Sequence, residues 1–196
     1  GFVAGTKSIS GNLHLSTTYS YGASAKEPFK ADQTIEDFST GVNISSVWGR
    51  FDFQYDYKNR LIKVEQTTPA IGDWEYTLEI FYNDKDNVTA MASEWTTGPR
   101  GPKSVITVSA YDDKPNPYSS IPQWKFISDA GWSFYDPEAM LTALNKNNPL
   151  DYTFGTFKRK MEYTYNEKGY PVKRINTNTN PSGQFKFEET FTYQCN

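Results

Sequence analysis

Apolar and polar residues alternate with a period of two along much of the chain. Between positions 49 and 57, Phe51, Phe53 and Tyr55 fall on one side of this pattern, while Arg50 and Asp52 fall on the other. Successive side chains of a β-strand point to opposite faces, so this spacing predicts a strand with one face buried. The same alternation is found in four further stretches, at 13–21, 74–82, 159–165 and 184–193.

One hairpin phrase occurs three times, beginning at residues 51, 78 and 159. In each copy a strand ends in an aromatic residue, and an Asx residue, a few polar residues and a second strand follow. An Asx side chain accepts hydrogen bonds from the backbone two residues on, which closes a tight turn. We expect Asn59, Asn87 and Gly169 to supply the left-handed backbone that such turns require.

The segment from residue 112 to 151 interrupts this rhythm. Pro115 and Pro117 stand where a weaker fourth copy of the phrase would have its return strand, so the chain is expected to leave the sheet there. A helix is predicted over residues 138–146, because Asp136 suits the N-cap and Pro137 the first helical position. We interpret the whole segment as a lid or plug over one end of the sheet.

The fold class that these patterns predict is all-β. We expect an antiparallel meander of roughly ten or eleven strands that forms a barrel or half-barrel, with one short helix in the insertion. Residues 1–196 are expected to fold as a single domain. Residues 1–10 are predicted to be a loose lead-in, and residues 22–32 a loop.

Aromatic residues change the picture of the core. They make up 16% of the chain, with 14 Tyr, 13 Phe and 5 Trp, so a core built here must consist of rings rather than of Leu and Ile. The apolar faces are interrupted by polar residues such as Gln66 and Glu189, which would be costly against lipid. We therefore favour a soluble sheet with its rings inside, and keep a small outer-membrane barrel as an alternative.

Charge and chemistry exclude several classes of function. The chain has 20 basic and 23 acidic residues, and it lacks the basic stripe that nucleic acid requires. In the longest basic run, Lys158 and Lys160 are expected on the solvated side of a strand and Arg159 on the other. One cysteine, Cys195, and one histidine, His14, cannot build a zinc or thiolate site. We expect no metal and no cofactor, and no apolar run is long enough for a transmembrane helix.

Aromatic rings in and near the insertion are the best candidates for a binding site. Rings with apolar faces and polar edges suit a glycan, a lipid or a peptide, although these rings could also simply close the end of the sheet. The candidates are Trp124, Trp132, Phe134 and Tyr135, with Trp95 and Arg100 on a neighbouring loop.

Two adjacent carboxylates, Asp112 and Asp113, complete the candidate binding residues. Together with Glu138 they define the alternative function, a carboxylate-based hydrolase. Neighbouring residues in a strand point to opposite faces, so the competing interpretation is that both aspartates belong to a turn. We predict no catalytic residue.

The turn motifs lie at Tyr55-Asp56-Tyr57-Lys58-Asn59-Arg60 and at residues 111–117, 147–150 and 165–169. They resemble the tyrosine-aspartate repeats (YD or RHS type) of secreted bacterial proteins. The chain as a whole resembles an uncharacterised family of Bacteroidetes lipoproteins with a porin-like β-fold. This resemblance implies a soluble domain in the periplasm or at the cell surface, anchored to the outer membrane through a removed, lipid-bearing N-terminal segment. It brings no catalytic residues, so the expected function is a non-catalytic binding or scaffold module for an extracellular ligand.

Overall fold

The computed structural model describes residues 3–10, 12–23, 26–39, 44–69, 72–98, 103–120, 141 and 144–193. This part of the chain contains twelve β-strands and one short 3-10 turn, η2 (Pro117–Ser120). The strands are β1 (Val3–Ser10), β2 (Leu13–Tyr21), β3 (Pro28–Asp37), β4 (Ile44–Tyr55), β5 (Leu61–Thr68), β6 (Trp74–Tyr82), β7 (Val88–Trp95), β8 (Ser104–Pro115), β9 (Asn147–Phe154), β10 (Phe157–Tyr165), β11 (Pro171–Asn180) and β12 (Gly183–Thr190).

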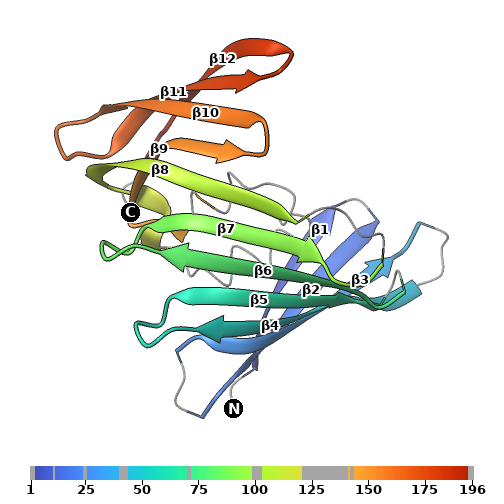
Figure 1. The fold of residues 1–196 in the computed structure, drawn as a ribbon. Helices are drawn as coiled ribbons and strands as arrows, with labels where there is room; N and C mark the ends of the chain where they lie inside the picture. The colour runs from blue at the N-terminus through green and yellow to red at the C-terminus, as the bar shows by residue number, and fades with distance from the viewer. Residues whose placement is uncertain are drawn as a thin grey trace. The chain divides into compact units, whose positions relative to one another are not determined.

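The strands follow each other in the sheet in the same order as in the chain, from β1 to β12 (Figure 1). The hairpins β1–β2, β4–β5 and β10–β11 are all antiparallel. Among the described strands β1 and β12 are the two ends of this order, as in an open sheet and not in a closed barrel. The predicted all-β antiparallel meander is therefore confirmed, with twelve strands instead of ten or eleven.

The chain divides into two compact units. Unit 1 comprises Gly1–Ile80, Ser93–Lys103 and Gln123–Trp132, and unit 2 comprises Phe81–Ala92, Ser104–Pro122 and Ser133–Asn196. That residues 1–196 form a single domain stays a prediction.

The three predicted hairpin turns share one geometry. In the turn after β4, the Oδ1 atom of Asp56 accepts hydrogen bonds from the backbone N–H groups of Lys58 and Arg60, at 2.9 and 3.0 Å. The backbone adds a bond from Asn59 N–H to the Asp56 carbonyl, at 2.9 Å. The turns that begin at Asn83 and Asn166 repeat all three bonds. The recurring phrase in the sequence is thus a recurring three-residue turn.

The left-handed residue always occupies the fourth position of this turn. It is Asn59 in the first turn, with φ 60°, and Gly169 in the third, with φ 80°. In the second turn it is Asp86, with φ 62°, so the expectation for Asn87 was wrong by one position. The side chain of Asn87 instead donates to Asn147 Oδ1 at 3.0 Å.

In unit 1 the alternation produces the expected aromatic core. Phe51 and Phe53 are 0% and 5% exposed and stack at 6.3 Å between ring centroids. Arg50 and Asp52, between and beside them, lie on the exposed face. Aliphatic residues contribute equally, since Leu61 and Val64 on β5 are fully buried. The core is therefore built from rings together with aliphatic side chains, rather than from rings alone.

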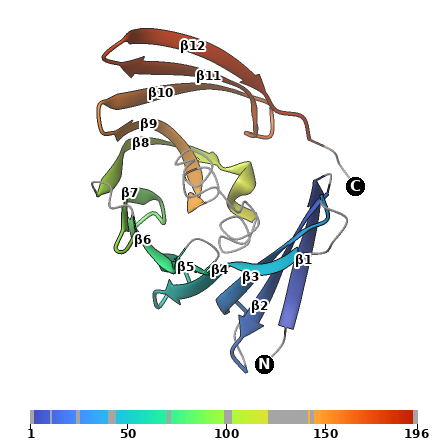
Figure 2. The same cartoon turned by 90° about the vertical axis from the view of Figure 1, so that its right-hand side faces the viewer.

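In unit 2 the buried face of β10 and β11 is largely polar, which differs from the prediction. Figure 2 shows these strands side by side with β9 and β12. The buried polar side chains there are Arg159, Arg174, Asn176 and Asn178. The rings of Phe185 and Phe187 on β12, by contrast, are 51% and 37% exposed. The reason is the position of β12 at the end of the strand order, where β11 is its one neighbour among the described strands.

Arg159 faces the interior, as the alternation predicted, while Lys158 and Lys160 lie on the exposed face. The Nε atom of Arg159 donates a hydrogen bond to Asn178 Oδ1 at 2.6 Å. Its guanidinium carbon lies 5.3–5.7 Å from the ring centroids of Tyr152, Phe157 and Phe187. Cation–π contacts and this hydrogen bond compensate the burial of the charge.

Three segments differ from the sequence prediction. Residues 3–10 form β1, paired with β2, and are not a loose lead-in. The strand β3 begins at Pro28, inside the predicted loop. The chain does leave the sheet after Pro115, but β9 then pairs with β8 and supplies the missing return strand.

Most of the predicted helix lies outside the described residues. Leu141 and Leu144, the described residues within it before position 145, are helical and buried. Asn145 follows them and accepts a hydrogen bond from Val88 N–H at 2.6 Å. This part of the insertion is therefore fixed to the sheet of unit 2.

Candidate functional site

Several of the predicted binding residues lie outside the described part of the chain. They are Arg100, Trp124, Trp132, Phe134 and Tyr135. The structure describes Trp95 in unit 1, and Asp112 and Asp113 in unit 2.

Trp95, at the end of β7, belongs to a packed group of rings in unit 1. It meets Trp74 edge to face, with 5.9 Å between centroids, and Tyr76 at 5.1 Å. The loop that follows is closely fitted to these rings, since a Cβ atom on Gly98 would lie 2.5 Å from Trp74. The Trp95 side chain is half-buried and packs against Trp74 and Tyr76, so it contributes to the packing of unit 1.

The two adjacent aspartates point to different environments. Asp112 is part-buried and accepts hydrogen bonds from the backbone N–H and the side-chain amide of Asn148, both at 3.0 Å. It also accepts from the Tyr165 hydroxyl and from Lys114 N–H. The side chain of Asp113 is 85% exposed and lies 3.3 Å from Lys114 Nζ. The two carboxylates do not converge on a site, and Asp112 joins β8, β9 and β10.

A second polar cluster links β10, β11 and β12. Arg174 forms two hydrogen-bonded contacts with Glu189 Oε2, at 2.8 Å from Nε and 2.6 Å from Nη2. Asn176 donates to the same oxygen at 2.5 Å. Burial raises the pKa of Tyr163, and the neighbouring Arg174 only partly opposes this shift. The adjoining pocket has a volume of about 10 Å³, which is the size of one water site, so this cluster is a structural network.

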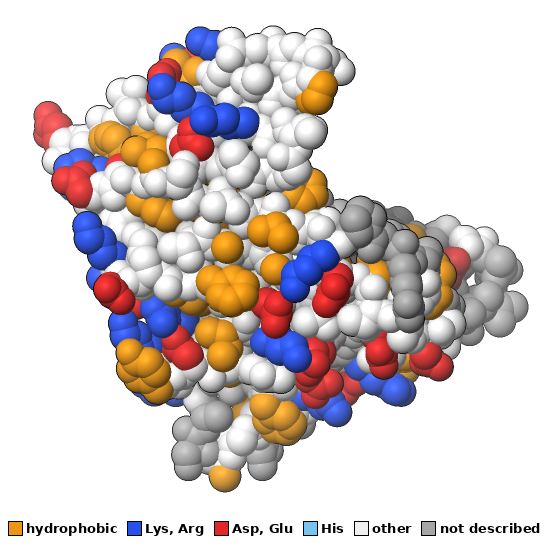
Figure 3. All heavy atoms as spheres, viewed as in Figure 1, with side chains coloured by type: hydrophobic (Ala, Val, Ile, Leu, Met, Phe, Trp, Pro, Cys, Tyr) orange, Lys and Arg blue, Asp and Glu red, His pale blue; other side chains and the backbone are white. Residues whose placement is uncertain are grey.

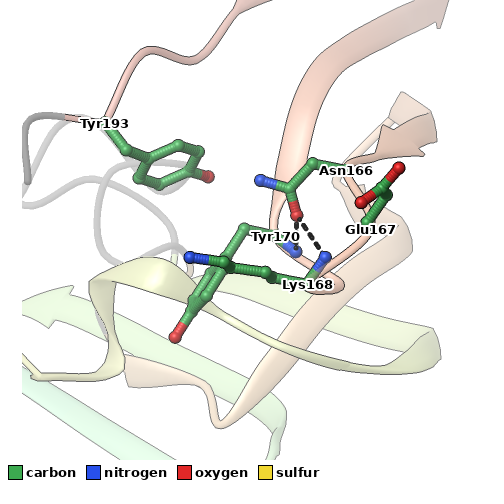
Figure 4. A pocket seen from close by; sticks show the side chains of 5 residues that line it. All are labelled: Asn166, Glu167, Lys168, Tyr170 and Tyr193. Atoms are coloured by element: carbon green, nitrogen blue, oxygen red, sulfur yellow. Dashed lines mark hydrogen bonds between the residues drawn. The ribbon is translucent and has the colours of Figure 1, made fainter.

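The larger described pocket lies at the turn between β10 and β11. It has a volume of about 390 Å³ and is lined by Asn166, Glu167, Lys168, Tyr170 and Tyr193. Figure 4 shows the rings of Tyr170 and Tyr193 on either side of it, with Lys168 extending from the turn toward them. A volume of this size falls within the range of small-ligand pockets, roughly 300–1,000 Å³.

Three hydrogen bonds and one ring contact fix the geometry of this pocket. Asn166 Oδ1 accepts from the backbone N–H groups of Lys168 and Tyr170, both at 3.0 Å. The Tyr193 hydroxyl donates to the Pro171 carbonyl at 2.6 Å. The two tyrosine rings lie 5.6 Å apart and are tilted by 49°. Burial is the main cause that raises the pKa of Tyr193, and electrostatic interactions with Tyr118 and Tyr170 raise it further. The Tyr193 hydroxyl therefore stays protonated at neutral pH.

The sequence did not predict this pocket. The alternation over residues 184–193 predicts a strand that includes Tyr193, but β12 ends at Thr190 and residues 191–193 lie outside it. A signal was present in the third turn, where an aromatic residue follows the left-handed glycine. The first and second turns have Arg60 and Asn87 at that position.

Charged side chains of both signs are interspersed on the face shown in Figure 3. Oppositely charged side chains pair in both units, for example Lys63 with Glu65 at 2.8 Å in unit 1 and Lys158 with Asp151 at 3.4 Å in unit 2. Within the described residues there is no group of three His, Cys, Asp or Glu side chains that could hold a metal ion. Nor does any helix in that part of the chain have the length and apolar character needed to cross a membrane.

The fold and its turns define an all-β antiparallel meander protein. Its structure is similar to the crystal structure of a porin-like protein from Bacteroides uniformis, with a TM-score of 0.54 and 11% sequence identity. The similarity covers 94% of this chain and 73% of that chain. No family model matches the sequence, and no curated protein is significantly similar to it. At this identity the likeness concerns the fold, which is a porin-like β-fold.

Proposed function

We propose that the chain is a non-catalytic binding or scaffold module of the bacterial cell envelope that holds an extracellular ligand against aromatic rings. The observation that carries this proposal is the pocket between Tyr170 and Tyr193, whose two rings remain 39% and 42% exposed. Exposed rings held in a fixed orientation favour binding, because little side-chain freedom is lost when a ligand docks.

The proposed location rests on the porin-like fold of the neighbour from Bacteroides uniformis and on the resemblance to Bacteroidetes lipoproteins. The module would sit in the periplasm or at the cell surface, held to the outer membrane by a lipid-bearing segment that precedes residue 1. In each of the three turns a tyrosine precedes the Asx residue, as Tyr55-Asp56, Tyr82-Asn83 and Tyr165-Asn166, which is the basis for the proposed resemblance to tyrosine-aspartate repeats.

The aromatic residues of the insertion are a separate candidate for ligand binding. Trp124, Trp132, Phe134 and Tyr135, together with Arg100, carry rings and a cation suited to a glycan, a lipid or a peptide.

Neither alternative function gains support from a specific observation. A hydrolase would need an Asp112 carboxylate that is free to exchange a proton with a substrate. Here the carboxylate accepts hydrogen bonds from Asn148, Tyr165 and Lys114 and holds neighbouring strands together. An outer-membrane barrel would turn its rings toward lipid, whereas Phe51 and Phe53 are buried. We expect the chain to stay folded and dispersed in buffer without detergent, as checked by size-exclusion chromatography with light scattering. Aggregation that only detergent reverses would support the membrane alternative.

A thermal-shift screen against neutral and acidic oligosaccharides, fatty acids and short peptides tests the binding proposal. A ligand at about 100 times its dissociation constant stabilises a protein by about 2.7 kcal/mol, which raises the melting temperature measurably. We expect one of these classes to do so. Substituting alanine for Trp124, Trp132 or Tyr193 should reduce this shift, whereas Tyr57→Ala, at a residue that is 90% exposed, should not. A flat response to every class would contradict the proposal.

A further inference from the structure

The third hairpin turn is built like the other two but presents a different side chain at its fifth position. In the first turn this residue is Arg60, whose Nη2 pairs with Asp56 at 2.6 Å. In the second it is Asn87, which is 1% exposed and bonded to Asn147. Both side chains therefore hold the fold together. In the third turn it is Tyr170, which is 39% exposed and faces the pocket.

The two rings of this pocket are held in place before any ligand arrives. The bond from the Tyr193 hydroxyl to the Pro171 carbonyl fixes the Tyr193 ring. The bond from Tyr170 N–H to Asn166 Oδ1 fixes the backbone that carries the other ring. With a tilt of 49° between them, the rings offer two apolar faces inclined to each other. Such faces suit the C–H faces of a puckered ring better than a single flat aromatic ligand.

The rim of the pocket carries polar groups of both signs. Lys168 supplies an ammonium group and Glu167 a carboxylate, and both residues are exposed. The Asn166 side chain uses its oxygen for the turn, and its amide NH₂ group supplies two further donors. The rim therefore has both hydrogen-bond donors and an acceptor, with one positive and one negative charge. A ligand that is rich in hydroxyl groups and has no net charge can bond to all of them, because a hydroxyl both donates and accepts.

The geometry points to a neutral glycan as the ligand of this pocket, with a pyranose unit between Tyr170 and Tyr193. This inference rests on the proposed function and specifies the ligand class at its described site. A volume of about 390 Å³ is near the lower end for small-ligand sites, which suits a terminal or single sugar unit. A fatty acid would pair its carboxylate with Lys168 but leave Glu167 and the Asn166 amide without partners, and an acidic glycan would bring its charge next to the Glu167 carboxylate as well as to Lys168.

Nuclear magnetic resonance of the ¹⁵N-labelled full chain provides the test. The probes are neutral hexasaccharides of glucose (α-1,4 and β-1,4 linked), mannose and xylose, with oligogalacturonate and decanoate as the acidic-glycan and lipid comparisons. We expect a neutral hexasaccharide to shift the amide signals of Lys168 and Tyr170. Tyr170→Ala and Tyr193→Ala should each weaken its affinity by roughly tenfold or more, the loss expected when one stacking ring is removed.

The matched controls separate the ring from the hydroxyl and this turn from the first one. Tyr170→Phe keeps the stacking face and should retain binding within about threefold, because hydrogen bonds at an exposed site contribute little net energy. Tyr57→Ala removes an exposed tyrosine from the first turn and should leave the affinity unchanged. Because Tyr170 is exposed, its alanine variant remains informative even if Tyr193→Ala fails to fold.

Three results would overturn the inference. They are preferential binding of oligogalacturonate or decanoate, unchanged glycan affinity in Tyr170→Ala, and the absence of any shift with all four neutral hexasaccharides. In the first two cases the chain still binds a ligand, so the proposed function survives while the assignment of this pocket fails. The proposed function fails together with this inference only if the thermal-shift screen shows no ligand and alanine at Trp124 or Trp132 has no effect on binding.

Discussion

Asx residues at the start of the hairpin turns have the same role three times in this molecule. Asp56, Asn83 and Asn166 each accept two backbone hydrogen bonds. Asp56 adds a charged contact, because its Oδ2 atom accepts from Arg60 Nε at 2.7 Å. Burial pushes the pKa of Asp56 up, but the hydrogen bonds from Arg60 and Lys58 and the charge of Arg60 outweigh it, so that the pKa lies below its usual value.

We predict that Asp56→Ala lowers the free energy of unfolding by about 2 kcal/mol at pH 7, since it removes hydrogen bonds to a charged acceptor. A carboxylate whose pKa is lower in the folded than in the unfolded state stabilises above the unfolded value of about 3.9. That contribution is lost as the pH falls through the folded pKa. Urea unfolding at pH 7 and at lower pH should therefore show the difference from the wild type shrinking below about pH 4.

Asp52→Ala is the control for this prediction. The Asp52 side chain is 55% exposed and lies 3.8 Å from Lys30 Nζ, so its loss should cost less than about 0.5 kcal/mol. Equal effects at positions 52 and 56, or a difference that grows on acidification, would argue against the turn's contribution.

At the scale of the strand, sequence alternation identifies a face but not what covers it. It correctly placed Phe51 and Phe53 inside, and it correctly turned Arg159 away from its two lysine neighbours. It could not indicate that β12 has one neighbour among the described strands, which leaves Phe185 and Phe187 exposed. Three-dimensional pairing decides such outcomes, and it also produced β1 and β9 from segments with little alternation.

The same limit applies to the candidate site. Asp112 was identified from its charge, but its partners Asn148 and Tyr165 lie 36 and 53 positions away in the chain. No local pattern shows that such residues will meet. Tyr170 could have been suspected from its turn, whereas its contact with Tyr193 depends on where β12 ends. The turns can thus be predicted from residues that are neighbours in the sequence, whereas the pocket depends on residues that are far apart in it.

The buried pair of β10 and β11 provides a prediction at this scale. Arg159→Met should lower the free energy of unfolding by about 1–3 kcal/mol, because Asn178 Oδ1 loses the donor that lies at 2.6 Å and stays buried. Adding Asn178→Leu should restore part of the loss, since replacing both partners with apolar groups can be nearly neutral. Chemical denaturation of the two single variants and the double variant measures this coupling.

Lys160→Met, on the opposite face of β10, is the matched control and should change stability by no more than about 0.5 kcal/mol. If Arg159→Met and Asn178→Leu had strictly additive effects, the interaction between β10 and β11 described above would be unimportant for stability.

At the scale of the whole molecule, a porin-like β-fold appears with only 11% sequence identity to its structural neighbour. What a sequence must retain for this fold is a period of two, tight Asx turns and a buried face, and many residue choices satisfy these conditions. The orientation of the apolar face is the claim on which both the core and the proposed function depend. A soluble module needs these positions inside, and a lipid-facing barrel would need them outside.

Cysteine labelling tests this orientation most directly. In a Cys195→Ser background, single cysteines replace a buried and an adjacent exposed residue in each unit, with Val64 and Glu65 in unit 1 and Val108 and Thr107 in unit 2. A charged, water-soluble maleimide should modify positions 65 and 107 rapidly in detergent-free buffer, and positions 64 and 108 only after denaturant is added. Rapid labelling at 64 and 108 in the folded chain, or protection at 65 and 107, would contradict the account.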